Sequence, residues 1–207
     1  WKDFILTNGA EMQAPQIPGT LPAADIKRLK LDAFDRSNDL KPLSVVTGDI
    51  IAKNAYEWSK ATESPLAQAA VKGAEKITVR PLLGHSGKAV KLPKGASLSY
   101  DFYCDKSGDA RFTIAVIPCF LNAVKNMRVS VSIDRGEPVI CQLKEVYNSK
   151  DWKFDLWRGQ TLKSFYVTLP GGSHNVTIKA LDDNVMIDQW VLDYDVDREY
   201  YVFPVAK

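Results

Sequence analysis

Apolar and polar residues alternate with a period of two over most of the chain from residue 77 onward. In "SLSYDFY", Leu98, Tyr100 and Phe102 fall on one side of an extended chain, and Ser99 and Asp101 fall on the other. Successive side chains of a strand point to opposite faces, so this pattern predicts a strand with one buried face. The same alternation occurs in the segments 111–117, 128–133, 165–169 and 176–180.

Turn-forming residues separate these segments. Residues 106–109, 134–138 and 170–173 are rich in Gly, Asp, Ser and Pro, which suit the backbone conformations of tight turns. Short alternating strands joined by such turns are typical of antiparallel β-sandwiches and barrels rather than of folds that alternate strands and helices. The sequence therefore predicts an all-β, antiparallel fold.

The segment 185–195, "VMIDQWVLDYD", does not alternate cleanly, because apolar residues fall on both sides of it. This predicts either a central strand that is covered on both faces or a strand that carries a bulge. Asp188 lies inside this apolar segment, and a buried carboxylate is costly without a hydrogen-bonding partner or a cation. We therefore expect Asp188 to have one or the other.

Two parts of the chain depart from the strand pattern. Residues 1–43 contain several prolines and keep no periodicity, which predicts an extended connector, with the sandwich domain over 44–207. Residues 63–76 are rich in alanine, with Ser64 placed to cap a helix and Pro65 at its first position. They predict a short helical insertion between strands.

Composition and charge narrow the range of binding partners that the chain can have. The formal net charge of +2 gives no reason to expect nucleic acid, and no apolar run is long enough to span a membrane. The chain begins at Trp1 without the residue order of a signal peptide, so we expect it to be part of a longer protein. The chain has three cysteines. We expect all three to be buried thiols; the alternative is a disulfide between Cys104 and Cys119.

Catalytic chemistry has little support in the sequence. The two histidines, His85 and His174, lie in predicted turns without a nucleophile motif nearby, so we expect neither to be catalytic. Acids are concentrated between 182 and 197, yet their spacing is not that of a calcium-binding EF-hand loop. They predict a charged surface, with Asp188 and Asp193 as weak metal-ligand candidates.

Aromatic side chains are the better candidates for a ligand site, because exposed rings stack on the apolar faces of sugars. Trp152 and Trp157 lie in "NSKDWKFDLWRG", a polar stretch between strands. The other carbohydrate-binding candidates are His85, Trp58 and Arg158. The alternative is that the tryptophans cover one end of the core.

A series of motifs in a fixed order points to a family. These are "PLLGHSG" (81–87), "AVKLP" (89–93), "LSYDFYCDKSGDARFTIAVIPCF" (98–120), "MRVSVSIDRGEP" (127–138) and "LPGGSHNVTIKALDDNVMIDQWVLD" (169–193). The series resembles the C-terminal domain of glycoside hydrolase family 115, the α-glucuronidases that remove glucuronic or methylglucuronic acid side chains from xylan. It covers about 77–193.

The resemblance implies a jelly-roll β-sandwich, similar to carbohydrate-binding modules and galactose-binding-like domains, attached behind a catalytic barrel. The chain alone would then be non-catalytic, without a cofactor, in a periplasmic or extracellular glycoside hydrolase. It would support the barrel, form a homodimer or position xylan-type polysaccharide. The alternatives are a stand-alone carbohydrate-binding or adhesion module and, least favoured, an independent hydrolase that uses His85 or His174.

The sequence departs from the family pattern at three places. Ile77 stands where family members tend to have Trp. His85-Ser86 replaces an Arg-Thr pair in the loop from Gly84 to Gly87, which we call the glycine loop. Related binding modules hold calcium with an Ala-Glu pair in the first strand, where this chain has Ala52-Lys53. Because a lysine repels a cation, the resemblance favours no calcium site there.

Overall fold

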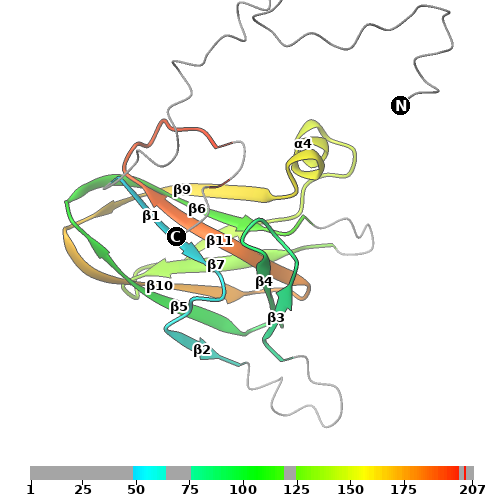
Figure 1. Cartoon of the computed structure of the whole chain (residues 1–207), viewed down its shortest axis with the longest axis horizontal. Coiled ribbons are helices and arrows are strands. Elements are labelled where there is room, and N and C mark those ends of the chain that lie inside the picture. The colour runs from blue at the N-terminus through cyan, green and yellow to red at the C-terminus, as the bar shows by residue number, and fades with distance from the viewer. Residues whose placement is uncertain (1–48, 64–75, 119–124, 201–202, 204–207) are drawn as a thin grey trace, which may run out of the picture. The chain divides into compact units, whose positions relative to one another are not determined.

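The computed structural model describes residues 49–63, 76–118, 125–200 and 203, which form two antiparallel sheets packed face to face (Figure 1). Sheet A has the strand order β3-β4-β11-β6-β9, and β1 also pairs with β11; sheet B has the order β2-β5-β10-β7-β8. Sheet A contains β1 (Ile50–Asn54), β3 (Thr78–Pro81), β4 (Lys88–Leu92), β6 (Gly108–Val116), β9 (Thr161–Leu169) and β11 (Val185–Asp193). Sheet B contains β2 (Lys60–Thr62), β5 (Ser97–Cys104), β7 (Arg128–Ile133), β8 (Val139–Gln142) and β10 (Gly172–Ala180). The predicted all-β antiparallel sandwich is confirmed.

The core lies between the sheets and contains the side chains that the alternation places inward. Leu98, Tyr100 and Phe102 of β5 are buried, as are the inward positions of β7 and β10 in the same sheet and of β6 in the facing sheet. Trp190 of β11 is at the centre of the core. Its ring centroid lies 5.6 Å from that of Tyr100 and 5.4 Å from that of Phe112. The period-two pattern therefore identified the buried face of each of these strands.

Strand β11 is covered on both faces and also carries a bulge, so both alternatives for the segment 185–195 are correct. Ile187 and Trp190 face the main core, while Val191 joins a second apolar cluster with Ala115 and Phe203 on the outer face of sheet A. The pairing of β11 with β6 shifts register between Ile187 and Gln189, which places Asp188 at the irregularity.

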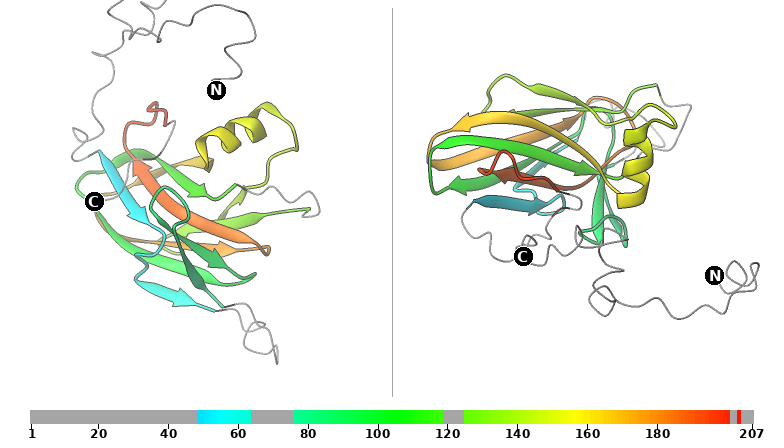
Figure 2. Two further views of the ribbon diagram at one scale, coloured as in Figure 1. Left: turned by 45° about the vertical axis from the view of Figure 1, so that its right-hand side comes forward. Right: turned by 90° about the horizontal axis from the view of Figure 1, so that it is seen from above.

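The helix that the structure describes between strands is α4 (Lys150–Arg158), in a stretch where the sequence predicts a polar connection between strands (Figure 2). Ser149 caps its start by accepting a hydrogen bond from the Trp152 N–H at 3.1 Å, and Gly159 ends it with φ of 70°. The only residue that α4 buries is an acid, Asp155. Periodicity could not indicate this helix, because α4 has no apolar stripe facing the core. The helix expected at 63–76 falls almost wholly outside the described residues, as do the connector 1–43 and its boundary.

Two of the three cysteines can be placed. Cys104 and Cys141 are buried and form no disulfide, so the alternative Cys104–Cys119 bridge is wrong; Cys119 itself is outside the described residues. Burial raises the pKa of the Cys141 thiol, which favours the neutral form. Across the described ranges, no helix has the length and apolar character needed to cross a bilayer.

Candidate functional site

The structure separates the candidates that the sequence grouped as a carbohydrate site. Trp157 is 78% exposed on α4, whereas Trp152 is half-buried, with its ring centroid 5.0 Å from that of Tyr147. Trp58 is half-buried and packs on the core from the link between β1 and β2, a segment that lies away from α4 in both figures. The tryptophans therefore do not line one surface.

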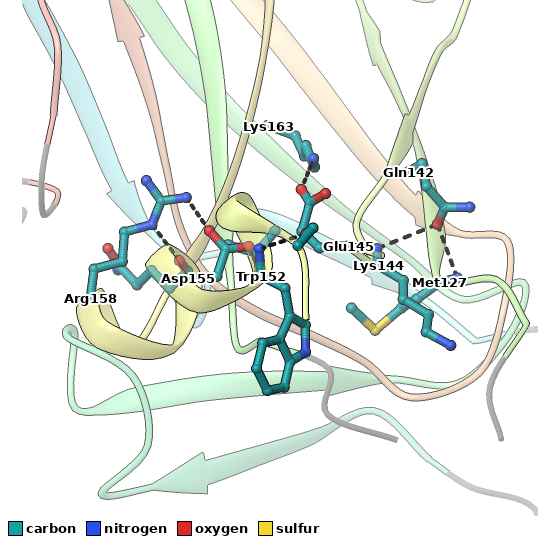
Figure 3. Close-up of polar contacts among 11 residues, drawn as sticks. Met127, Gln142, Lys144, Glu145, Trp152, Asp155, Arg158 and Lys163 are labelled. Carbon is teal, nitrogen blue, oxygen red and sulfur yellow. Dashed lines mark hydrogen bonds and ion pairs between the residues drawn. The ribbon is translucent and has the colours of Figure 1, made fainter. Parts of the chain in front are cut away.

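His85 and Arg158 do come near each other. A Cβ atom added to Gly159 would lie 3.3 Å from the His85 Nε2, so the exposed imidazole lies beside the end of α4. Arg158 donates from its Nε to the Gln160 carbonyl at 2.6 Å and forms an ion pair with Asp155. Figure 3 shows Arg158 and Trp152 leaving α4 in different directions. Arg158 thus stabilises the end of the helix.

Asp188 obtains the partner that its burial requires from protein donors. Its carboxylate accepts hydrogen bonds from the His85 N–H at 2.7 Å, the Ser86 N–H at 3.2 Å, the Ser86 hydroxyl at 2.5 Å and the Gln160 amide at 2.8 Å. The glycine loop is therefore fastened to β11 by a buried acid. This close approach explains Gly84, which has φ of 78° and where a Cβ atom would lie 2.3 Å from the Asp188 Oδ1.

Asp193, the other weak metal-ligand candidate, also has protein partners. It accepts hydrogen bonds from the Tyr200 hydroxyl and from the Asp195 N–H, and the Arg198 Nε lies 3.2 Å from its Oδ2. Within the described part of the chain, no group of three or more His, Cys, Asp or Glu residues is arranged to hold a metal ion.

A different surface carries the features of a ligand site, namely the outer face of sheet B. It contains two adjoining hollows of about 530 and 710 Å³ that share Asp101, Asp134 and Asn175. We call this surface the sheet B groove. Its floor is formed by the outward positions of β5 and β10, with Ser59 and Lys60 on one side and Asp134 and Arg135 on the other. The floor residues are Ser99, Asp101, Tyr103, Ser173, Asn175 and Thr177.

Strand register brings the floor residues together in cross-strand pairs. Asp101 lies opposite Asn175, and Tyr103 lies opposite Ser173. The Asn175 amide donates to the Asp101 carboxylate at 2.7 Å, and hydrogen bonds from the Asn175 and Ser59 side chains lower the pKa of Asp101. Tyr103 is 62% exposed, so the groove combines an ionised acceptor, one amide and several hydroxyls with an open aromatic ring. This mixture can stack on a sugar ring and bind its hydroxyls.

The sequence pattern contains a signal for this groove that tryptophan positions alone do not show. Phe102 and Tyr103 are adjacent, so one of the two rings must point outward from a strand. An aromatic residue on the polar phase of an alternating strand is exposed, and the neighbouring outward positions of β5 are Ser99 and Asp101. Their partners on β10 could not be assigned without the register.

His174 borders the groove as a structural residue. Its side chain is only 4% exposed, and both ring nitrogens face acceptors: Nδ1 lies 2.6 Å from the Asp134 Oδ2, and Nε2 lies 2.9 Å from the Pro170 carbonyl. Burial of the ring opposes the charged form, but the two hydrogen bonds outweigh it and raise the pKa of His174. Burial likewise opposes ionisation of Asp134, yet the hydrogen bonds from His174 and the Asn175 N–H lower its pKa.

The raised pKa of His174 predicts a pH-dependent stability. The charged ring stabilises the folded state fully below the unfolded pKa of about 6.5, and this contribution is lost as the pH rises through the higher folded pKa. We expect the free energy of unfolding to fall by on the order of 1 kcal/mol as the pH rises from the unfolded pKa of His174 through its folded pKa. Urea denaturation at a series of pH values measures the change.

The two histidines supply a matched comparison for this prediction. His174→Gln should remove the pH dependence above 6.5, whereas His85→Gln, which changes an exposed imidazole, should retain it. An unchanged profile in His174→Gln would show that another group titrates.

The fold and the groove together define an antiparallel β-sandwich with an aromatic-bearing polar surface across one sheet. The model of the family described as "Glycosyl hydrolase family 115 C-terminal domain" matches residues 47–206. The chain belongs to this family. It is therefore a β-sandwich domain of a carbohydrate-active enzyme family.

Solved structures with a similar fold come from carbohydrate-active proteins. One is described as a family GH115 4-O-methyl-α-glucuronidase, BtGH115A, with specificity for decorated arabinogalactans; it is 25% identical with a TM-score of 0.57. The alignment covers 73% of this chain and 18% of that enzyme, so the chain spans under a fifth of its length.

Two carbohydrate-binding modules are also similar. The C-terminal family 6 module of a laminarinase from Zobellia galactanivorans is 16% identical, with a TM-score of 0.48 over 70% of this chain and 99% of the module. A family 35 module from Clostridium thermocellum is 14% identical, with a TM-score of 0.44 over 65% of this chain and 98% of the module. No curated protein sequence matches the chain significantly.

Proposed function

We propose that the chain is a non-catalytic domain of a family 115 glycoside hydrolase and that it holds polysaccharide in the sheet B groove. The observation that carries this proposal is the exposed Tyr103 ring beside the paired Asp101 and Asn175 side chains. A domain of this kind raises the local concentration of a polymer near the catalytic part of the same protein. Membership of the family supports the link to such an enzyme.

The pKa shifts of the groove carboxyl groups support a role in binding rather than in hydrolysis. Glycoside hydrolysis generally uses two carboxyl groups, one of which has a raised pKa so that it can donate a proton. Both groove acids, Asp101 and Asp134, instead have lowered pKa values. Ionised carboxylates of this kind accept hydrogen bonds from sugar hydroxyls, so their role in the proposal is recognition.

Two polysaccharides are suggested by the proteins that this chain resembles. The resemblance to α-glucuronidases suggests xylan, whereas BtGH115A is described as specific for decorated arabinogalactans. We include both polymers as ligands to be compared. From the same resemblance we propose that the parent enzyme acts in the periplasm or outside the cell and has a catalytic barrel ahead of this domain.

Tyr103→Ala is expected to weaken polysaccharide binding by at least about tenfold, because the ring supplies the apolar surface on which a sugar packs. Affinity electrophoresis and calorimetry with glucuronoxylan and arabinogalactan measure the change. Tyr147→Ala is the matched control, because Tyr147 is also 62% exposed but does not line the groove. Equal affinities of Tyr103→Ala and the unmodified chain would refute the groove as the binding site.

Helix α4 favours a second role, contact with the rest of the parent enzyme or with a second copy of the chain. It exposes Phe154, Leu156 and Trp157 while burying an acid, and a short helix with this many exposed apolar side chains supports an interaction site. Trp157→Ala in the same binding assay separates the two roles. A loss of polysaccharide affinity would show that the glycan site includes α4. An unchanged affinity would favour a protein contact for the apolar side chains of α4.

A further inference from the structure

A smaller pocket of about 260 Å³ lies on the outer face of sheet A, on the opposite side of the sandwich from the sheet B groove. We call it the sheet A pocket. Helix α4 contributes Phe154 and Arg158, the segment after β11 contributes Tyr200, and the floor comes from β6 and β9. The floor residues include Arg111, Thr113 and Ser164.

Arg111 is the unusual member of the pocket. Among the described residues, no carboxylate lies within ion-pair distance of its guanidinium, and its buried Nε has no hydrogen-bonding partner. Its guanidinium carbon lies 6.0 Å from the centroid of the Tyr200 ring. Buried donors are rarely left without an acceptor in native proteins, so an arginine that lines a pocket with an unsatisfied Nε and no paired carboxylate favours an anionic ligand.

The acids near Arg111 have other positions or partners. Asp155 pairs with Arg158, which keeps that second guanidinium fixed at the pocket. Asp193 is engaged by Tyr200 and Arg198. Glu199 also lines the pocket, but its side chain is exposed at the rim. The interior charge that remains without a partner is therefore positive.

The other groups in the pocket suit a hydroxylated ring. The Thr113 and Ser164 hydroxyls lie 2.8 Å apart, so each has hydrogen-bonding capacity beyond this shared bond. Tyr166, 70% exposed, is the cross-strand partner of Arg111, so a second tyrosine lies on the same face of sheet A next to the pocket. A pocket of about 260 Å³ is below the roughly 300–1,000 Å³ of drug-sized ligand sites, which fits one monosaccharide unit.

We propose that the sheet A pocket binds the carboxylate of a hexuronic acid unit through Arg111, with the sugar ring against the tyrosines and hydroxyls. A guanidinium binds a carboxylate through two parallel hydrogen bonds, a geometry that a neutral sugar cannot reproduce. This site differs from the sheet B groove in sheet, residues and ligand charge. It therefore stands independently of the proposed function.

The test compares D-glucuronate with D-glucose and with acetate, by NMR titration of the labelled chain. We expect D-glucuronate to bind at least about tenfold more tightly than either comparison ligand, because only it offers both the carboxylate and the ring. Arg111→Gln should lose this preference, with at least about tenfold weaker binding. Arg80→Gln is the matched control, because Arg80 is exposed on β3 and outside both sites.

A second variant keeps the proposal testable if Arg111→Gln fails to fold. Ser164 is exposed, so Ser164→Glu should be tolerated and should place a competing carboxylate in the pocket. It should abolish D-glucuronate binding, whereas Tyr103→Ala should leave that binding unchanged. Equal binding of D-glucuronate and D-glucose, equal binding of acetate, or normal binding by Ser164→Glu would each overturn the proposal.

Discussion

Replacing Asp188 with alanine is expected to lower the free energy of unfolding by at least about 3 kcal/mol. The change removes the acceptor of two backbone N–H groups and the shorter of two hydrogen bonds from the Ser86 hydroxyl and from the Gln160 amide. These two side chains keep longer hydrogen bonds of 3.4 Å, to the Lys88 carbonyl and the Gln189 side chain respectively. An unsatisfied buried donor costs about 1–3 kcal/mol, and water entering from the exposed side of the loop offsets part of the sum. Urea denaturation measures the loss.

Two further variants define what Asp188 contributes. Asp188→Asn keeps one acceptor oxygen but turns an amide N–H₂ toward the same donors, so its destabilisation should lie between zero and that of the alanine variant. Asp197→Ala, which removes an exposed acid, should change stability by less than about 0.5 kcal/mol. If Asp188→Ala were as stable as Asp197→Ala, the glycine loop would have to be held by other contacts.

Trp190→Ala is expected to destabilise the domain by about 3–5 kcal/mol, the range for removing a large aromatic side chain from a core. Trp190 is fully buried, and its ring contacts Tyr100, Phe102 and Phe112 from both sheets. Its removal leaves a cavity where the two sheets meet. Denaturant titration followed by circular dichroism gives the change in free energy without relying on tryptophan fluorescence.

The tryptophan of α4 provides the matched control. Trp157→Ala makes the same chemical change at a side chain that is 78% exposed, so it should alter stability by less than about 0.5 kcal/mol. Trp190→Phe should cost less than Trp190→Ala, because it keeps a ring and breaks no hydrogen bond: the Trp190 Nε1 has no partner in the described structure. A small loss in Trp190→Ala would contradict the central position of this residue in the core.

These predictions separate two kinds of residue in the domain. Trp190 and Asp188 stabilise the sandwich and the glycine loop, whereas Tyr103 and Arg111 lie at surfaces where a ligand is proposed. A loss of binding in Tyr103→Ala or Arg111→Gln is meaningful only where the unfolding free energy is preserved. The stability measurements therefore serve as controls for the binding measurements.

The candidate site illustrates the limit of reasoning from the sequence. The sequence predicts a carbohydrate site built on tryptophans, because their rings stack on sugars. Trp152 and Trp157 lie five positions apart in α4, however, so they leave the helix on different sides. Trp58 packs on the core. Residue type alone cannot show which rings share a surface, because the sequence of α4 has no periodicity that predicts a helix.

The alternation along the chain is enough to predict β5, β6, β7, β9 and β10 with their buried faces, the turns that follow them and the family. These properties depend on local order, since alternation with a period of two records which side of each strand is apolar. Which distant residues meet can be known only from the folded domain. Asp101 and Asn175 are 74 positions apart, and Asp188 is 103 positions from His85. Those contacts depend on strand order and register, which follow from how the two sheets pack rather than from any one segment.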